Sequence, residues 1–137
     1  MKPLELLQAA QRARKNAYTP YSNFRVGAAL LTKDGRVFLG ANVENSSLGA
    51  TICAERSALV SAVSSGARSF EAIAVAGAPG GKEAAAPCPP CGICLQFMSE
   101  FCGPEFPVYL ADGQGGARKY MLKELFPHAF LNTNMQK

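Results

Sequence analysis

The segment at residues 51–59 reads Thr51-Ile52-Cys53-Ala54-Glu55-Arg56-Ser57-Ala58-Leu59. It places a thiol two residues before a carboxylate, at the point where a loop turns into a predicted helix. A second segment, at residues 87–94, supplies three more thiols in a similar setting and reads Pro87-Cys88-Pro89-Pro90-Cys91-Gly92-Ile93-Cys94. We expect the two segments to share one zinc ion, with Glu55 carrying out proton chemistry beside it.

Length and composition indicate one globular protein. The 137 residues are enough for a single domain over 1–137, and 48% of them are apolar while 18% are charged. The formal charge of +4 is spread along the chain, which favours a solvated surface over a nucleic-acid partner. No apolar run is long enough to cross a bilayer and no leader-like segment is present, so we expect a cytoplasmic protein without a membrane partner. Five cysteines in such a protein favour metal binding or catalysis over disulfides.

The order of predicted elements indicates an α/β fold. Pro3 opens an apolar pattern at helical spacing that Pro20 closes, and Asp34-Gly35 is a strong hairpin signal between two strands. The further elements that we expect are a helix at 54–63, a strand at 70–76, a helix at 91–101, strands at 106–111 and 118–122, and a helical turn at 123–126. Two helix–strand alternations after a hairpin predict a mixed sheet with helices on both faces.

Cys91 and Cys94 are the strongest candidate metal ligands. Their spacing of three places both thiols on one face of a helix, near a first turn whose exposed N–H groups stabilise thiolates. Cys53, at the start of the other helix, is the third candidate. A catalytic zinc takes three protein ligands because its fourth position is kept for water.

Cys88 leaves two alternatives open. It has the same spacing to Cys91 as Cys94 has, but the two prolines between them hold that segment out of a helix, which favours a buried or spare thiol. As a fourth ligand, Cys88 would instead complete a structural, non-catalytic zinc module together with Cys53, Cys91 and Cys94.

Glu55 favours the catalytic interpretation, because a carboxylate beside an open zinc position can take a proton from water and hand it to a leaving group. Two residues on a regular helix point about 200° apart, so Cys53 and Glu55 face one ion only if Cys53 lies at the very start of its helix. Three thiolates also bring an excess of negative charge, which Arg56 and the helix N-termini are expected to offset.

Two stretches resemble the zinc signature of the small homotetrameric cytidine deaminases, namely Cys53-Ala54-Glu55-Arg56 and Pro90-Cys91-Gly92-Ile93-Cys94-Leu95-Gln96. Residues 18–31, 42–45 and 124–130 are also similar to that family, so the resemblance covers nearly the whole chain. It implies a three-layer α/β/α fold around a five-stranded mixed sheet. It also implies one zinc ion per subunit and a homotetramer with shared active sites.

The activity implied by the resemblance is hydrolytic deamination of cytidine and deoxycytidine to uridine and deoxyuridine. Glu55 would take a proton from water, deliver it to ring nitrogen N3 and then move a proton to the departing amine. Arg56 and Gln96 would support the site. The implied substrate contacts are Phe24 against the base, Asn42 and Glu44 at the ribose hydroxyl, the Ala54 N–H at the base carbonyl, and Phe130 in a neighbouring subunit's pocket.

Three positions depart from the family pattern. Leu95 stands where an arginine is usual, Leu48 replaces a residue that is often aromatic, and Cys88 is an extra thiol. These departures leave open a shifted substrate, such as a cytidine modified on its exocyclic amine or another nucleoside.

Overall fold

A computed structural model describes residues 1–135 of the chain. Its main elements are α1 (Pro3–Ala13), β1 (Phe24–Thr32), β2 (Val37–Ala41), α2 (Ala54–Ser64), β3 (Phe70–Pro79), α3 (Gly92–Phe101), β4 (Pro107–Ala111), β5 (Ala117–Met121) and α4 (Leu122–Leu125). Three short 3₁₀ turns are Arg14–Asn16, Leu48–Ala50 and Asn132–Met135. Within the described residues, no helix has both the length and the apolar character needed to cross a membrane.

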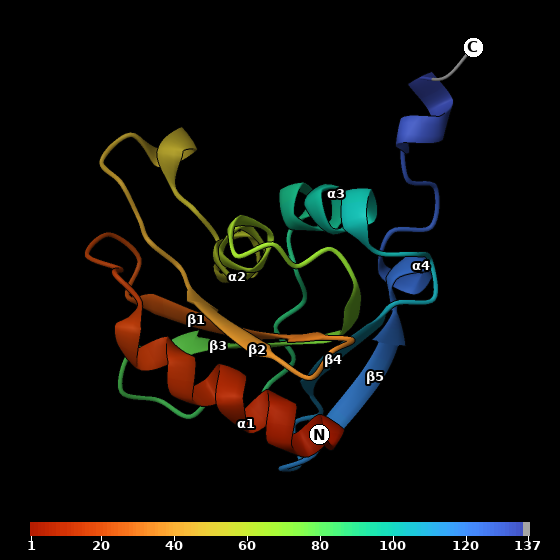
Figure 1. The fold of residues 1–137 in the computed structure, drawn as a ribbon. Coiled ribbons are helices and arrows are strands. Elements are labelled where there is room, and N and C mark those ends of the chain that lie inside the picture. Colours follow the sequence, from red (N-terminus) through yellow and green to blue (C-terminus); the bar gives the residue numbers. More distant parts are fainter. Residues whose placement is uncertain (136–137) are drawn as a thin grey trace.

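The five strands form one mixed sheet in the order β2-β1-β3-β4-β5. β3 and β4 are parallel, and the other neighbouring pairs are antiparallel. Helix α1 covers one face of the sheet, while α2, α3 and α4 lie on the other (Figure 1). The predicted three-layer α/β/α architecture around a five-stranded mixed sheet is therefore confirmed.

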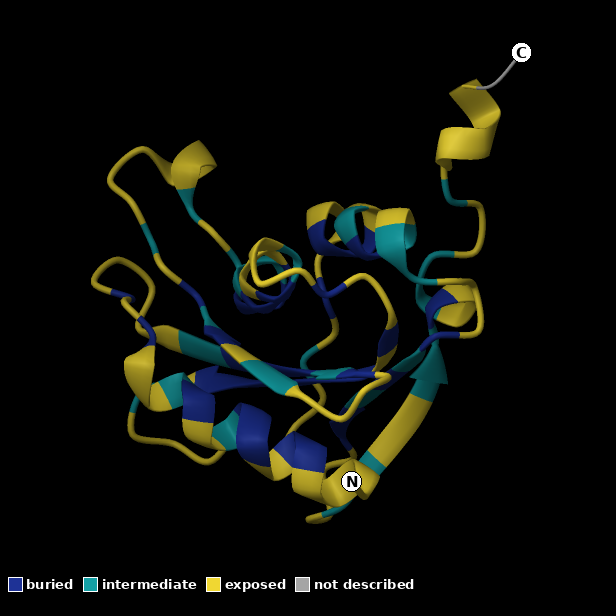
Figure 2. Ribbon diagram, in the orientation of Figure 1, coloured by how far each residue is buried: buried dark blue, intermediate teal, exposed yellow. Residues whose placement is uncertain are grey.

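Successive side chains along each strand point to opposite faces of the sheet and form two separate cores. On the α1 side, Leu6 and Leu7 pack against a small-residue surface that includes Ala29 and Ala74. On the other side, Leu59 of α2 and Met98 of α3 are fully buried against larger strand residues. Figure 2 shows the buried stripe of α1 facing the sheet, as expected for an amphipathic helix. This second core fixes α2 and α3 side by side on the sheet.

Two glycines allow helices to approach the sheet closely. A Cβ on Gly40 of β2 would lie 2.3 Å from the Ala54 carbonyl oxygen, at the start of α2. A Cβ on Gly27 of β1 would lie 2.0 Å from the Ala10 carbonyl oxygen of α1. Both distances are far shorter than any van der Waals contact, so only glycine fits there. The Gly40 contact sets how deeply the N-terminus of α2, and with it the candidate site, sits over the sheet.

The structure differs from the sequence-based prediction at several boundaries. β3 continues to Pro79, whereas a loop was expected from Gly77, because the backbone of β1 pairs with β3 along this whole stretch. That pairing outweighs the low strand propensity of alanine and glycine. The first helix ends at Ala13 and tightens into the 3₁₀ turn Arg14–Asn16, well before Pro20.

Candidate metal centre and active site

Three thiols meet where two helices begin. Cys53 is the N-cap of α2 and Cys91 is the N-cap of α3, and both have extended backbone angles, while Cys94 lies in the first turn of α3. The Cys53 and Cys91 sulfurs are 3.8 Å apart, and the Cys91 and Cys94 sulfurs are 3.6 Å apart. All three sulfurs lie within 4.8 Å of one another. The structure thus brings the three predicted ligands together.

The spacing of these sulfurs fits zinc. Tetrahedral zinc with thiolate bonds of about 2.3 Å places neighbouring sulfurs about 3.8 Å apart, close to the two distances given above. Among residues 1–135, the groups that could hold a metal comprise Cys53, Cys91 and Cys94 and do not include Cys88. A three-thiol set leaves one position open, which matches a catalytic site and speaks against the four-cysteine structural module.

The backbone at Cys53 meets the geometric condition for sharing the site with Glu55. Cys53 has φ −74° and ψ 157°, so it precedes the regular helix, and Glu55 lies in the first turn. Glu55 is only 4% exposed. Burial, reinforced by the nearby Cys53 thiolate, raises the pKa of Glu55 to about 7. A buried carboxyl group of this kind can exchange protons at neutral pH.

The thiols differ in acidity. The neighbouring Cys94 thiol, and after it the Arg56 guanidinium, lower the pKa of the Cys53 thiol to about 5. The neighbouring Cys53 thiolate, together with burial, raises the pKa of Cys94. Of Cys53 and Cys94, Cys53 is therefore the one that favours the thiolate, the form that binds metal.

Arg56 supplies the positive charge expected beside the thiols. Its Nη2 donates to the Thr51 carbonyl oxygen at 3.2 Å and contacts the Cys53 sulfur at 3.6 Å. Its Nε is buried and has no hydrogen-bond partner among the described residues. The hydrogen bond to Thr51, in the loop before α2, thus holds the Arg56 guanidinium beside the thiols. Leu95, where the family resemblance expected a second cation, is 7% exposed and packs into the core with Met98.

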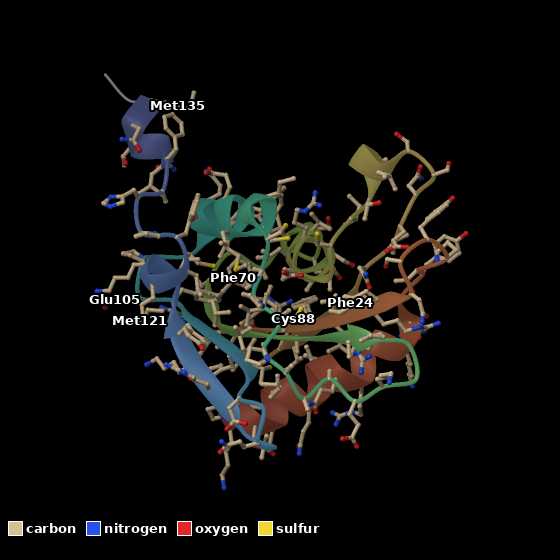
Figure 3. The ribbon with its side chains drawn as sticks, turned by 180° about the vertical axis from the view of Figure 1, so that it is seen from behind. Phe24, Phe70, Cys88, Glu105, Met121 and Met135 are labelled. Atoms are coloured by element: carbon tan, nitrogen blue, oxygen red, sulfur yellow. The ribbon has the colours of Figure 1, made fainter. Side chains whose placement is uncertain are left out.

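Cys88 lies close to Phe24 and outside the metal cluster. A Cβ on Gly77 would come within 2.6 Å of the Cys88 sulfur and 3.0 Å of the Phe24 Cε1 atom, so both side chains crowd the β3 backbone at this glycine. Figure 3, which views the molecule from behind, labels Phe24 and Cys88 near each other over the sheet. Burial, reinforced by the Glu55 charge, raises the pKa of Cys88 to about 11. Cys88 thus favours its protonated form and lies outside the three-thiol group.

Asn42 and Glu44 follow β2 and are both engaged with the backbone near Phe24. The buried Asn42 amide accepts from the Val26 N–H and donates to the Phe24 carbonyl oxygen, each at 2.9 Å. Glu44 accepts from the Tyr21 and Ser22 N–H groups at 3.0 and 3.1 Å and from the Ser22 hydroxyl. These bonds lower the pKa of Glu44 and keep it ionised.

The other predicted site residues are dispersed. Ala54 is the first residue of α2, so its N–H has no acceptor within the helix. Phe24 is 39% exposed at the start of β1. Phe130 is 57% exposed, in the segment that runs away from the sheet after α4 (Figure 1). Gln96 of α3 donates to the Phe130 carbonyl oxygen at 2.7 Å and so anchors that segment.

Three participants in this arrangement were missed by reasoning from sequence. Tyr21 and Ser22 hold Glu44, and Thr51 holds Arg56. Tyr21 and Thr51 contribute only backbone atoms, and the Ser22 hydroxyl is distant from Glu44 in sequence. Local sequence patterns carry no signal for such contacts, since any residue type can supply a carbonyl oxygen or an N–H group.

Comparisons with known proteins point the same way as the geometry. The sequence model of the family described as "Cytidine and deoxycytidylate deaminase zinc-binding region" matches residues 2–110. The chain is 48% identical over 130 residues to a cytidine deaminase of Halalkalibacterium halodurans, covering 95% of each chain. It is 45% identical over 131 residues to a cytidine deaminase of Sporosarcina psychrophila, covering 96% of this chain and 93% of that one.

Solved structures agree with this comparison. The crystal structure of cytidine deaminase from Burkholderia pseudomallei superimposes with a TM-score of 0.85 at 49% identity, covering 95% of this chain and 100% of that one. The enzyme from Mycobacterium tuberculosis gives a TM-score of 0.76 at 39% identity, covering 92% and 94% of the two chains.

Proposed function

Because the chain belongs to the zinc-binding family of cytidine and deoxycytidylate deaminases, we propose that it hydrolyses cytidine and deoxycytidine to uridine and deoxyuridine with release of ammonia. The observation that carries this proposal is the meeting of Cys53, Cys91 and Cys94 beside the buried Glu55 carboxylate. A structural zinc site has no need for a buried proton carrier. The three-thiol set, with its open fourth position, and the carboxylate together suit hydrolysis.

Glu55 moves the protons of this reaction. When bound by the three cysteines, zinc would act as a Lewis acid and lower the pKa of water. Glu55 takes a proton from the attacking water and delivers it to ring nitrogen N3 as the C4–O bond forms. It then carries the second water proton to the exocyclic amine, the C4–N bond breaks, and ammonia leaves with the C4 carbonyl formed. The water, its two protons and the amine are all accounted for, so Glu55 ends as it began.

The thiols need a counter-charge, which we assign to Arg56. Three thiolates exceed the charge of one zinc ion by one, and Arg56 is the cation whose guanidinium contacts the Cys53 sulfur. Its Thr51 bond holds the group in that position. Leu95 adds no charge there. The site is therefore expected to depend more strongly on Arg56 than a site with two arginines would.

The substrate contacts are also part of the proposal. Phe24 offers an exposed ring for stacking on a flat base. The Ala54 N–H, free at the start of α2, can donate to the base carbonyl. Asn42 retains one N–H proton beyond its bond to Phe24, and Glu44 is an ionised acceptor, so the pair suits a sugar hydroxyl.

We further propose that four copies assemble and complete each other's sites. Exposed apolar side chains occur in the loop before α2 and on the outer faces of α2 and α3, namely Leu48, Ile52, Val60 and Ile93. The Phe130 ring is exposed, and its segment extends away from the sheet of its own subunit. Figure 2 shows this segment and the loop before α2 as exposed. Such surfaces are covered by association.

Residues 1–137 are proposed to act as one domain, since both cores of the described part rest on one sheet. A cytoplasmic location is proposed as well, because three thiols that bind zinc must stay reduced and all five cysteines are free.

Ammonia release from cytidine, measured together with zinc content in the same sample, tests the activity. Deoxycytidine and N4-methylcytidine run in parallel, and ultraviolet absorbance follows each conversion. We expect turnover of cytidine and deoxycytidine at about one zinc per chain. A sample with full zinc that leaves both nucleosides unchanged would overturn the proposal. Turnover of N4-methylcytidine alone would replace it with the N4-modified substrate class.

A further inference from the structure

A basic hollow lies at the C-terminal end of α1, away from the zinc site. It has a volume of about 420 Å³ and is lined by Arg14, Lys15, Arg25 and Lys82, together with the glycine backbones at residues 80 and 81. In Figure 1 the loop that follows β3 passes beside this end of α1. Four cations thus converge from three segments that are distant in sequence. A hollow of this size is large enough for a small ligand.

The two arginines are held in place by neutral groups. Arg14 donates from Nε to the Arg25 carbonyl oxygen at 2.9 Å, from Nη1 to that of Lys82 at 3.0 Å, and from Nη2 to that of Ala78 at 3.0 Å. Arg25 donates from Nη1 to the Lys15 carbonyl oxygen at 3.2 Å. Their positions are therefore fixed while their charges remain uncompensated, because carbonyl oxygens carry no net charge.

Among residues 1–135, no carboxylate forms an ion pair with any of these four side chains. Within residues 1–135, the ion pairs are Arg36 with Asp34 and Lys123 with Glu105, all outside the hollow. Glu83 lines an adjoining cavity but does not line this one. The pKa of Arg14 is lowered first by burial and then by the charge of Arg25, which shows that the two guanidinium groups repel each other. An anion placed between them would relieve this repulsion.

We propose that this hollow binds the polyphosphate group of a small molecule. Arg14 uses its N–H groups mainly on the carbonyl oxygens of residues 25, 78, 79 and 82 and contributes its positive charge. Arg25 makes one such bond, so the rest of its guanidinium can donate to phosphate oxygens, and the exposed Lys15 and Lys82 ammonium groups can close over them as mobile charges. The four cations are confined to one hollow and form no extended track, which favours a compact polyanion over a nucleic-acid strand. The site faces away from α2 and α3, so the inference does not rest on the proposed deaminase activity.

Titration of the zinc-loaded protein with inorganic tripolyphosphate tests this site. Calorimetry at constant ionic strength, without added divalent cations, should give saturable binding at one site per chain, with zinc content unchanged afterwards. The double variant Lys15→Gln, Lys82→Gln should bind at least about tenfold more weakly. Both side chains are exposed and neither arginine bond is removed, so folding is preserved; the thermal unfolding midpoint checks this.

The double variant Lys33→Gln, Lys119→Gln is the matched control, because it removes the same charge from exposed lysines elsewhere on the surface. Equal affinity for tripolyphosphate and ATP would identify a free polyphosphate as the ligand, and tighter binding of ATP would identify a nucleotide; both support the proposal. Binding that does not saturate, or that weakens equally in both double variants, would overturn it. A single-stranded RNA that displaces tripolyphosphate and binds more tightly would overturn it in favour of a nucleic-acid surface.

Discussion

The Asn42 side chain bridges the two backbone groups on either side of Arg25: Nδ2 donates to the Phe24 carbonyl oxygen, and Oδ1 accepts from the Val26 N–H, each at 2.9 Å. Asn42 thereby fixes the start of β1, and with it the residue expected to contact the base. A residue that the family resemblance assigns to the sugar therefore also has a structural role.

Replacing Asn42 with alanine is expected to reduce both stability and substrate affinity. The Val26 N–H and the Phe24 carbonyl lose their partners, which costs about 1–3 kcal/mol in the free energy of unfolding. Phe24 loses its fixed position, so KM for cytidine should rise. Urea unfolding and steady-state kinetics measure the two effects. Asn16→Ala, at an exposed position after α1, should change stability by less than about 0.5 kcal/mol. Equal stability of the two variants would contradict the structural role of Asn42.

Glu55→Gln separates proton transfer from folding. The amide has nearly the same shape as the carboxyl group but cannot take up a proton, so kcat should fall by roughly 10²–10⁴-fold while zinc content and unfolding stay close to those of the parent. Ammonia release and metal analysis measure both quantities. Glu71→Gln, at an exposed position of β3, is the matched control and should retain full activity. Near-normal turnover by the Glu55 variant would end its assignment as the catalytic residue.

Arg56→Gln should loosen the metal. The thiols lose the guanidinium 3.6 Å from the Cys53 sulfur, and Leu95 offers no second cation. Zinc transfer to a colorimetric chelator is expected to be roughly 10–100-fold faster than in the parent. Arg68→Gln is the control, since Arg68 donates only to the carbonyl oxygens of Val63 and Ala67. Identical release rates in the two variants would show that the helix N-termini alone balance the thiolates.

Sequence patterns predicted the architecture because its determinants are local. Asp34-Gly35 sets the hairpin, and the loop before Ala54 allows Cys53 to cap α2. Contacts that join distant segments could not be predicted. Arg14 reaches carbonyl groups of the loop after β3, an interaction that leaves no trace in periodicity. β3 extends to Pro79 only because β1 pairs with it, a tertiary effect that overrides the local preference of its glycine and alanines.

Cys88→Ser distinguishes a three-thiol centre from a four-thiol structural site. Since Cys88 lies outside the cluster, the variant should hold about one zinc per chain and remain folded. Cys94→Ser removes a ligand and should lose most of its zinc. Cys102→Ser controls for the loss of a partly buried thiol outside the cluster, because desolvation raises the pKa of Cys102 to about 12 and favours its protonated form. Metal analysis after gel filtration measures the zinc content of all three variants. Zinc loss in the Cys88 variant that the Cys102 variant does not share would support the structural module.

Glu44 is expected to make the free energy of unfolding depend on pH, with stability decreasing at low pH. The Ser22 hydroxyl is the main cause of its lowered pKa, with the backbone N–H groups of Ser22 and Tyr21 adding to it. The folded pKa lies below the ordinary value of 4.5, so the folded state favours the ionised form. The contribution of Glu44 to the free energy of unfolding is therefore fully present above pH 4.5 and is lost as the pH falls through the folded pKa.

The comparison of parent and Glu44→Gln isolates this contribution. Their difference in unfolding free energy should be constant between about pH 7 and pH 5.5 and should shrink below about pH 4.5. Urea unfolding across this range measures it, and Glu83→Gln, at an exposed position, should show no comparable change. A difference that grows as the pH falls would mean that the protonated form of Glu44 is the one the fold prefers. The carboxylate would then not be the group that organises residues 21 and 22, and its proposed role at the sugar would lose its electrostatic basis.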